Sequence, residues 1–195
     1  GVTMLLTGII GLILSLVPNR NKSIKNREGL LITFLGWLFA SFFGCFPYIF
    51  SGSIPGFTDA FFETVSGFTT TSTTILESIE ALPSGILFWR SFTHWIGGMG
   101  ILVFTVALLP ALGAGSFQIF KAEYPGPQHE RIAPRIKDTA KILYLSYLII
   151  TALEIILLVL GGMNLFDAAI HAFGTVGTGG CSSRNASVGA YNSTY

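Results

Sequence analysis

The segment from Asp59 to Thr74 reads DAFFETVSGFTTTSTT, and its two parts differ in character. The first part, Asp59 to Phe68, predicts a short helix with Thr58 or Asp59 as the N-cap, because a side-chain oxygen there can accept from the first turn. The second part, Thr69 to Thr74, consists of β-branched hydroxyl residues and one serine, which favour extended backbone over helix. The segment therefore predicts a short helix followed by a polar strand.

A second copy of this arrangement occurs at Asp167 to Ser182, which reads DAAIHAFGTVGTGGCS. An ungapped alignment of the two segments pairs Asp59 with Asp167 and Ser72 with Gly180. Few residues are identical, but each copy follows a long apolar run. A repeat of this kind indicates a chain built on one repeated unit, which consists of a helix, a short helix, a polar strand and a closing helix.

The composition places these units in a membrane. Charged residues make up 11% of the 195 residues and hydrophobic residues 51%, whereas roughly a quarter of an ordinary soluble domain is charged. So few charges cannot cover a soluble domain of this size. The composition also excludes a disordered chain and a nucleic-acid-binding protein, and the two cysteines exclude a disulfide scaffold. We therefore expect an all-α integral membrane protein.

Four apolar runs approach the length of about 20 residues that a helix needs to cross a bilayer. The short helices of the two repeats cannot cross, so they are expected to enter the membrane and return as re-entrant half-helices. The four predicted spans are Val2 to Val17, Leu30 to Phe50, about Ile86 to Leu112 and about Ile142 to Gly161.

The charges between the runs predict their orientation. Pro18 to Gly29 carries four basic residues and one acidic residue, and Gly113 to Lys141 carries five basic and three acidic residues. Ser51 to Gly85 carries four acidic residues and no Lys or Arg. By the positive-inside rule both basic segments are cytoplasmic, and the acidic segment with the first repeat lies outside.

This arrangement predicts cation selection. Backbone carbonyls and hydroxyls in the polar strand can replace the hydration shell of an ion, and the negative C-terminal end of each short helix points toward that strand. The alternative is that both stretches are ordinary outer loops with Thr-rich turns. The repeat argues for the first interpretation.

Motifs along the chain resemble a known family. They are Glu63 to Thr74 (ETVSGFTTTSTT), His94 to Ile101 (HWIGGMGI), Lys121-Ala122-Glu123 with Pro125-Gly126-Pro127, Pro134-Arg135-Ile136 with Thr139-Ala140-Lys141, and Gly179-Gly180-Cys181-Ser182 with Asn185-Ala186-Ser187. In this order they resemble the Trk/Ktr/HKT potassium transporter superfamily, and within it the TrkH-type uptake subunits.

The resemblance implies a potassium-channel-like pore of four units in one longer chain, preceded by an extra helix pair. The implied function is potassium uptake across the cytoplasmic (inner) membrane by channel-like permeation, with sodium possible and no organic cofactor or enzymatic activity. The implied partners are the lipid bilayer, a second copy in a homodimer, and a cytosolic nucleotide- and NAD-binding ring protein that would dock on the basic loops.

The resemblance also divides the chain. Residues 1–29 would be one preceding helix and a basic loop, 30–112 the first pore unit (pore helix about 59–68, filter 69–74), 113–141 the cytoplasmic connection, and 142–195 an incomplete second unit (pore helix about 167–176, filter 177–182). The ion-binding residues carried over are Thr70, Thr71, Ser72, Thr73, Thr178, Gly179, Gly180 and Cys181.

Two filter positions depart from the family pattern. Ser72 stands where glycine is usual, and in the plant branch serine at that place goes with sodium permeation. Cys181 stands where an aromatic residue is common.

Three charged residues are candidate supporting groups. Arg90, near the outer start of the third span, has a functional role, reaches the membrane interface, or pairs with an acid such as Glu63. Glu154 lies in the middle of the fourth span, where an unpaired carboxylate would cost roughly 2.5–3.5 kcal/mol. Two alternatives to a channel stay open, namely a proton- or sodium-coupled symporter that uses Glu154, and a non-conducting membrane fragment.

Overall fold

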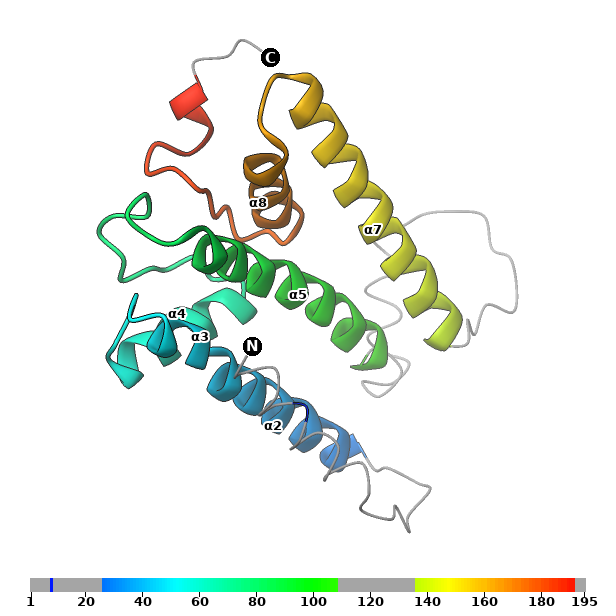
Figure 1. Cartoon of the computed structure of the whole chain (residues 1–195). Helices are drawn as coiled ribbons and strands as arrows, with labels where there is room; N and C mark the ends of the chain where they lie inside the picture. The colour runs from blue at the N-terminus through cyan, green and yellow to red at the C-terminus, as the bar shows by residue number, and fades with distance from the viewer. Residues whose placement is uncertain (1–7, 9–25, 109–135, 192–195) are drawn as a thin grey trace.

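The computed structural model describes residue 8, residues 26–108 and residues 136–191. The first predicted span, Val2 to Val17, and most of both basic segments lie outside the described residues, as does the predicted docking of a ring protein on those segments. The described part is helical and contains no β-strand. Its elements are α2 (Asn26–Gly44), α3 (Phe46–Phe50), α4 (Phe57–Phe68), α5 (Ser84–Leu108), α7 (Ile136–Leu160), α8 (Leu165–Val176) and the short 3₁₀ helix η2 (Ser187–Tyr191) (Figure 1).

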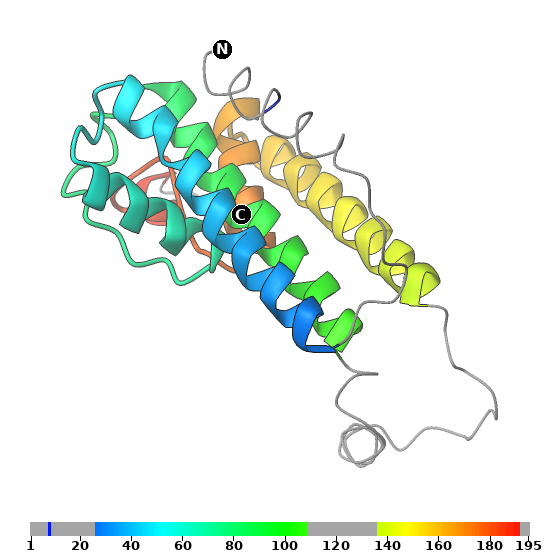
Figure 2. The same cartoon turned by 90° about the horizontal axis from the view of Figure 1, so that it is seen from below.

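Three long helices, α2, α5 and α7, run along a common direction, as Figure 2 shows from below. Their ends that lead into the two basic segments lie on one side of the molecule, and the short helices α4 and α8 lie toward the other side (Figure 1). The central helix α5 contacts both α4 and α8. It therefore connects the two repeats.

Two of the predicted spans are confirmed as helices that are long and apolar enough to cross a membrane. They are Leu31–Phe50, formed by α2 and α3, and Ala140–Leu160 in α7. Large apolar side chains on both are exposed, among them Phe34 on α2 and Ile149 and Ile156 on α7. An apolar outer surface of this extent is typical of helices that face lipid.

The third predicted span corresponds to α5, whose 25 residues make a helix about 37 Å long. Its first half carries buried polar residues that lower its hydropathy, including Arg90, Thr93 and His94. These side chains face protein because α5 lies between the two repeats.

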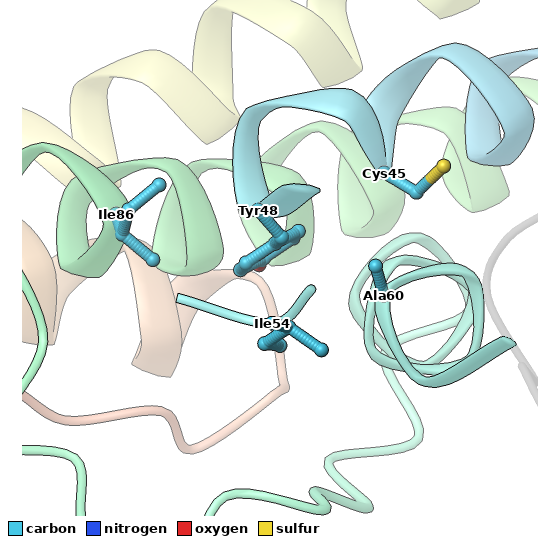
Figure 3. Close-up of a cluster of buried hydrophobic side chains, with 5 residues drawn as sticks. All are labelled: Cys45, Tyr48, Ile54, Ala60 and Ile86. Atoms are coloured by element: carbon cyan, nitrogen blue, oxygen red, sulfur yellow. The ribbon is translucent and has the colours of Figure 1, made fainter. Parts of the chain in front are cut away.

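A small apolar core fixes α4 against α3 and α5. Its buried members are Cys45, Tyr48, Ile54, Ala60 and Ile86, which gather between these helices (Figure 3). On the other side of α5, the ring of Phe173 in α8 lies 5.4 to 5.9 Å, between centroids, from three aromatic rings of α5. These rings belong to Phe88, Phe92 and Trp95.

The predicted N-cap of the first short helix is wrong. The helix begins at Phe57, and its N-cap is Gly56, which has extended backbone and makes no side-chain capping bond. Asp59 lies inside the first turn instead, where a carboxylate interacts favourably with the helix dipole. In α8 the N-cap is Asn164, whose side chain accepts a hydrogen bond from the backbone N–H of Asp167.

Candidate functional site: two matched loops at the ends of α4 and α8

The structure confirms the internal repeat. Both α4 and α8 have twelve residues, and the aligned Asp59 and Asp167 are each the third residue of their helix. Both helices end in the same backbone conformation, with φ −84° and ψ 0° at Thr69 and φ −70° and ψ −1° at Gly177.

The loops after these helices also match. At three matched positions in each loop, successive backbone N–H groups donate to carbonyls of the preceding helix over 2.9 to 3.1 Å. The pairs are Thr69 to Val65, Thr70 to Gly67 and Thr71 to Ser66 in the first loop, and Gly177 to Phe173, Thr178 to Thr175 and Gly179 to Gly174 in the second. In the second loop the N–H of Gly180 also donates to the carbonyl of Gly174, over 2.8 Å.

The backbone of both loops differs from the extended strand that the Thr-rich composition predicts. φ is positive at Thr70 (56°) and Ser72 (65°), and also at the aligned residues Thr178 (58°) and Gly180 (63°). Non-glycine residues rarely adopt this left-handed conformation, which costs roughly 1–2 kcal/mol per residue. The helix ends hold the loops in this conformation because their carbonyls capture the loop N–H groups.

This hydrogen bonding determines where the loop carbonyls point. The N–H and C=O of one trans peptide point in opposite directions, so the carbonyls of Thr70 and Thr178 face away from their own helices. Within the described residues, none of the carbonyls of residues 69–73 and 177–181 accepts a hydrogen bond. Each loop therefore presents unpaired oxygens.

The first loop is held from behind by Glu63, which is 3% exposed. Its carboxylate accepts hydrogen bonds from the Thr74 hydroxyl (3.0 Å to each oxygen) and from the Ile75 N–H (3.2 Å). Nε of the buried Arg90 donates to the same carboxylate over 2.7 Å. Of the roles considered for Arg90, the structure shows the ion pair with Glu63.

The second loop has a different support at the aligned positions. His171 replaces Glu63, and its Nε2 lies 2.9 Å from Oγ of Ser182, the residue aligned with Thr74. The sequence reasoning missed His171, although the ungapped alignment pairs it with Glu63.

Asp167 also holds this loop in place through hydrogen bonds. Its carboxylate accepts from Ser183 Oγ and from Asn164 Nδ2, both over 2.7 Å. Burial by itself would raise the pKa of Asp167, but these hydrogen bonds and the positive charge of Arg184 outweigh it, so the pKa lies below the usual aspartate value. Asp167 is therefore a carboxylate at neutral pH.

Helix α5 packs directly against both loops through consecutive glycines. A Cβ at Gly97 would overlap the carbonyl oxygen of Phe68, the last residue of α4. A Cβ at Gly98 would lie 3.0 Å from the Cα of Gly177, the first residue after α8. Only glycine allows α5 to approach both helix ends this closely.

The predicted site residues fall into two groups. Thr71, Ser72, Thr73, Thr178 and Gly180 are exposed and Thr70 is half-buried, whereas Gly179 and Cys181 are buried. The Cys181 thiol faces the His94 ring, with Sγ 3.0 Å from Nε2. Glu154 is half-buried in α7 beside Thr175 of α8.

The described residues contain no group of three or more His, Cys, Asp or Glu side chains that could hold a metal ion.

Comparison with known proteins gives a family. The TrkH family model, described as a cation transport protein, matches residues 3–195. The Trk system potassium uptake protein TrkH of Escherichia coli (strain K12) is 46% identical over 181 residues, which cover 90% of this chain and 37% of that protein. TrkG of the same strain, also a Trk system potassium uptake protein, is 38% identical over 87% of this chain and 35% of its own length.

A solved structure agrees with this relationship. The crystal structure of the potassium transporter TrkH from Vibrio parahaemolyticus matches with a TM-score of 0.82 and 37% identity, over 98% of this chain and 38% of that one. The chain thus spans less than two-fifths of the length of the relatives it matches. It belongs to the TrkH family of cation transport proteins.

Proposed function

We propose that this chain forms two of the four pore loops of a transporter that takes up potassium by channel-like permeation. The observation that carries the proposal is the pair of matched loops, each with its N–H groups bound to a helix end and its carbonyls unpaired. Carbonyl oxygens of this kind can replace the hydration shell of a potassium ion. The names of the relatives, which are potassium uptake proteins, support the same ion.

The electrostatics of the two helices favour the same function. The loops follow the C-termini of α4 and α8, where the helix dipole is negative. The carboxylate of Glu63 is neutralised by Arg90 and lies behind the loop. A cation would thus be attracted by dipoles without being trapped by a full opposite charge.

We further propose the division of the chain given by the family resemblance. Residues 30–112 would form one pore unit and residues 142–195 part of the next, joined by a cytoplasmic connection at 113–141. The whole transporter would lie in the inner membrane as a homodimer, gated by a cytosolic nucleotide- and NAD-binding ring protein. The candidate ion ligands are the residues of loops 70–73 and 178–181.

Ser72→Gly in a full-length transporter that contains this chain is expected to change ion preference toward potassium. Ser72 has φ 65° and its partner Gly180 has φ 63°, so glycine removes roughly 1–2 kcal/mol of backbone strain together with a hydroxyl. Potassium and sodium uptake are measured in a host deficient in potassium uptake, with Ser53→Gly, which changes an outer loop residue before α4, as the control. If Ser72→Gly alters neither the potassium-to-sodium ratio nor the rate, Ser72 is not a filter residue.

The chain expressed alone is expected to support no uptake, because two loops cannot enclose a four-fold filter. The measurement is growth of the same deficient host at low potassium, with membrane insertion checked by a tag. Growth that equals that given by the full-length transporter would contradict the four-loop arrangement, unless cross-linking shows that two copies assemble.

A further inference from the structure

Helix α5 supports both loops from one stretch of its surface. Arg90 holds Glu63 and through it the first loop. His94 lies one turn further along α5 and contacts the second loop at Cys181. The two loops are thus connected through adjacent turns of one helix.

His94 is almost completely buried, with 2% of its surface exposed. Its Nε2 lies 3.0 Å from Cys181 Sγ. A Cβ placed on Gly179 would overlap Nδ1 of the same ring. One face of the second loop, from Gly179 to Cys181, therefore rests on this imidazole.

The hydrogen bonds of His94 indicate its tautomer. Among the described residues Nδ1 has no hydrogen-bond partner. In native proteins, buried N–H groups without an acceptor are rarer than buried acceptors without a donor. The proton is thus assigned to Nε2, which donates to the sulfur of Cys181.

We propose that His94 is a positioning residue for ion selectivity, which acts by fixing the second loop through the Nε2–H···Sγ bond to Cys181 and the contact with Gly179. This inference rests on the proposed function. In this proposal the buried thiol of Cys181 is a support, and the loop's contribution to the filter comes from its backbone. Moving this backbone would change the spacing of its carbonyls, on which discrimination between ions depends.

Four variants of the full-length transporter test the proposal. His94→Leu removes the donor and keeps most of the volume, His94→Gln keeps a donor at the end of the side chain, and Cys181→Ala removes the acceptor. Ser91→Ala is the matched control, because Ser91 is 1% exposed on the same helix and its side chain makes no hydrogen bond to either loop among the described residues. The first readout is the ratio of potassium to sodium uptake, and the second is the rate at which a small cationic methanethiosulfonate modifies Cys181 in a background without other cysteines.

His94→Leu is expected to lower the uptake ratio about tenfold, the equivalent of one buried hydrogen bond, and to speed modification of Cys181 by a similar factor. His94→Gln is expected to stay within about twofold of the parent for both readouts. Cys181→Ala is expected to lower the uptake ratio as much as His94→Leu does. The double variant His94→Leu/Cys181→Ala is expected to have the same ratio as either single variant, because both substitutions remove the same hydrogen bond.

Three results would overturn the proposal. They are an unchanged ratio in His94→Leu, an equal change in Ser91→Ala, and additive effects of His94→Leu and Cys181→Ala. Failure of the proposed function can be distinguished from failure of this proposal, because in that case the parent protein itself would take up no potassium. The modification rate reports the position of Cys181 in either case.

Discussion

Arg90→Leu is expected to abolish potassium uptake and to destabilise the full-length transporter by about 3–5 kcal/mol, the cost of leaving one partner of a buried ion pair alone. Glu63 is 3% exposed and Arg90 4% exposed, so water cannot replace the lost partner. The same carboxylate holds Thr74 and the backbone of Ile75. Movement of this carboxylate after the loss of Arg90 would release the first loop.

The charge-neutral double variant Glu63→Gln/Arg90→Leu tests whether Arg90→Leu acts through an unpaired buried charge or through the changed shape of the side chain. Glutamine keeps one oxygen that can accept from Thr74 and Ile75, and no buried charge is left without a partner. Buried ion pairs are often replaced by neutral groups at little cost. The double variant is therefore expected to recover most of the stability that Arg90→Leu loses, and to recover part of the uptake.

The measurements are thermal unfolding of the purified protein and rubidium uptake in a deficient host. Lys141→Leu is the control, because Lys141 is exposed and exposed charge pairs contribute about 0–1 kcal/mol. If Arg90→Leu unfolds at the same temperature as Lys141→Leu, or the double variant is less stable than Arg90→Leu, the ion pair does not support the loop.

The sequence alone predicted the organisation of this molecule well because its signals are local. Long apolar runs correspond to α2 with α3 and to α7, and the repeat anchored at Asp59 and Asp167 corresponds to two helices of equal length. Hydropathy and the spacing of identical residues are enough for such features. The same reasoning also gave pairing with an acid such as Glu63 as one of three possibilities for Arg90.

The details that failed depend on tertiary contacts. A run of threonines favours extended backbone on average, but the carbonyls at the end of α4 capture the N–H groups of Thr69, Thr70 and Thr71 and force a left-handed turn. The secondary-structure propensities of single residues do not include this competition for backbone hydrogen bonds. The helix start at Phe57 likewise depends on how the preceding residues pack, with Ile54 in the core.

Contacts between the repeats were outside the reach of sequence reasoning. His94 and Cys181 belong to different units, and their pairing requires the packing of α5 on α8. The glycine pair at Gly97 and Gly98 was part of the family motif, but that its members face different loops follows only from the structure. The alignment did contain one unused signal, which is the replacement of Glu63 by His171.

Gly97→Ala is expected to reduce uptake more than tenfold and to destabilise the transporter by about 1–3 kcal/mol, the range for overpacking a close contact. The added methyl would overlap the carbonyl oxygen of Phe68 and lie 2.8 Å from its carbonyl carbon. These are backbone atoms at the point where α4 passes into the first loop. They cannot move without moving Thr69 and Thr70.

Gly36→Ala is the matched control, since it is also a glycine in the middle of an apolar helix and nothing lies within 4 Å of its added Cβ. Alanine is favoured over glycine in a helix by about 1 kcal/mol, so this variant is expected to be as stable as the parent or slightly more stable. The same gain in propensity applies at Gly97, and the contrast between the two variants therefore isolates the contact with Phe68. Equal unfolding temperatures and equal uptake for Gly97→Ala and Gly36→Ala would show that α5 can retreat from α4 without moving the loop, and the role assigned to α5 as a rigid support would be wrong.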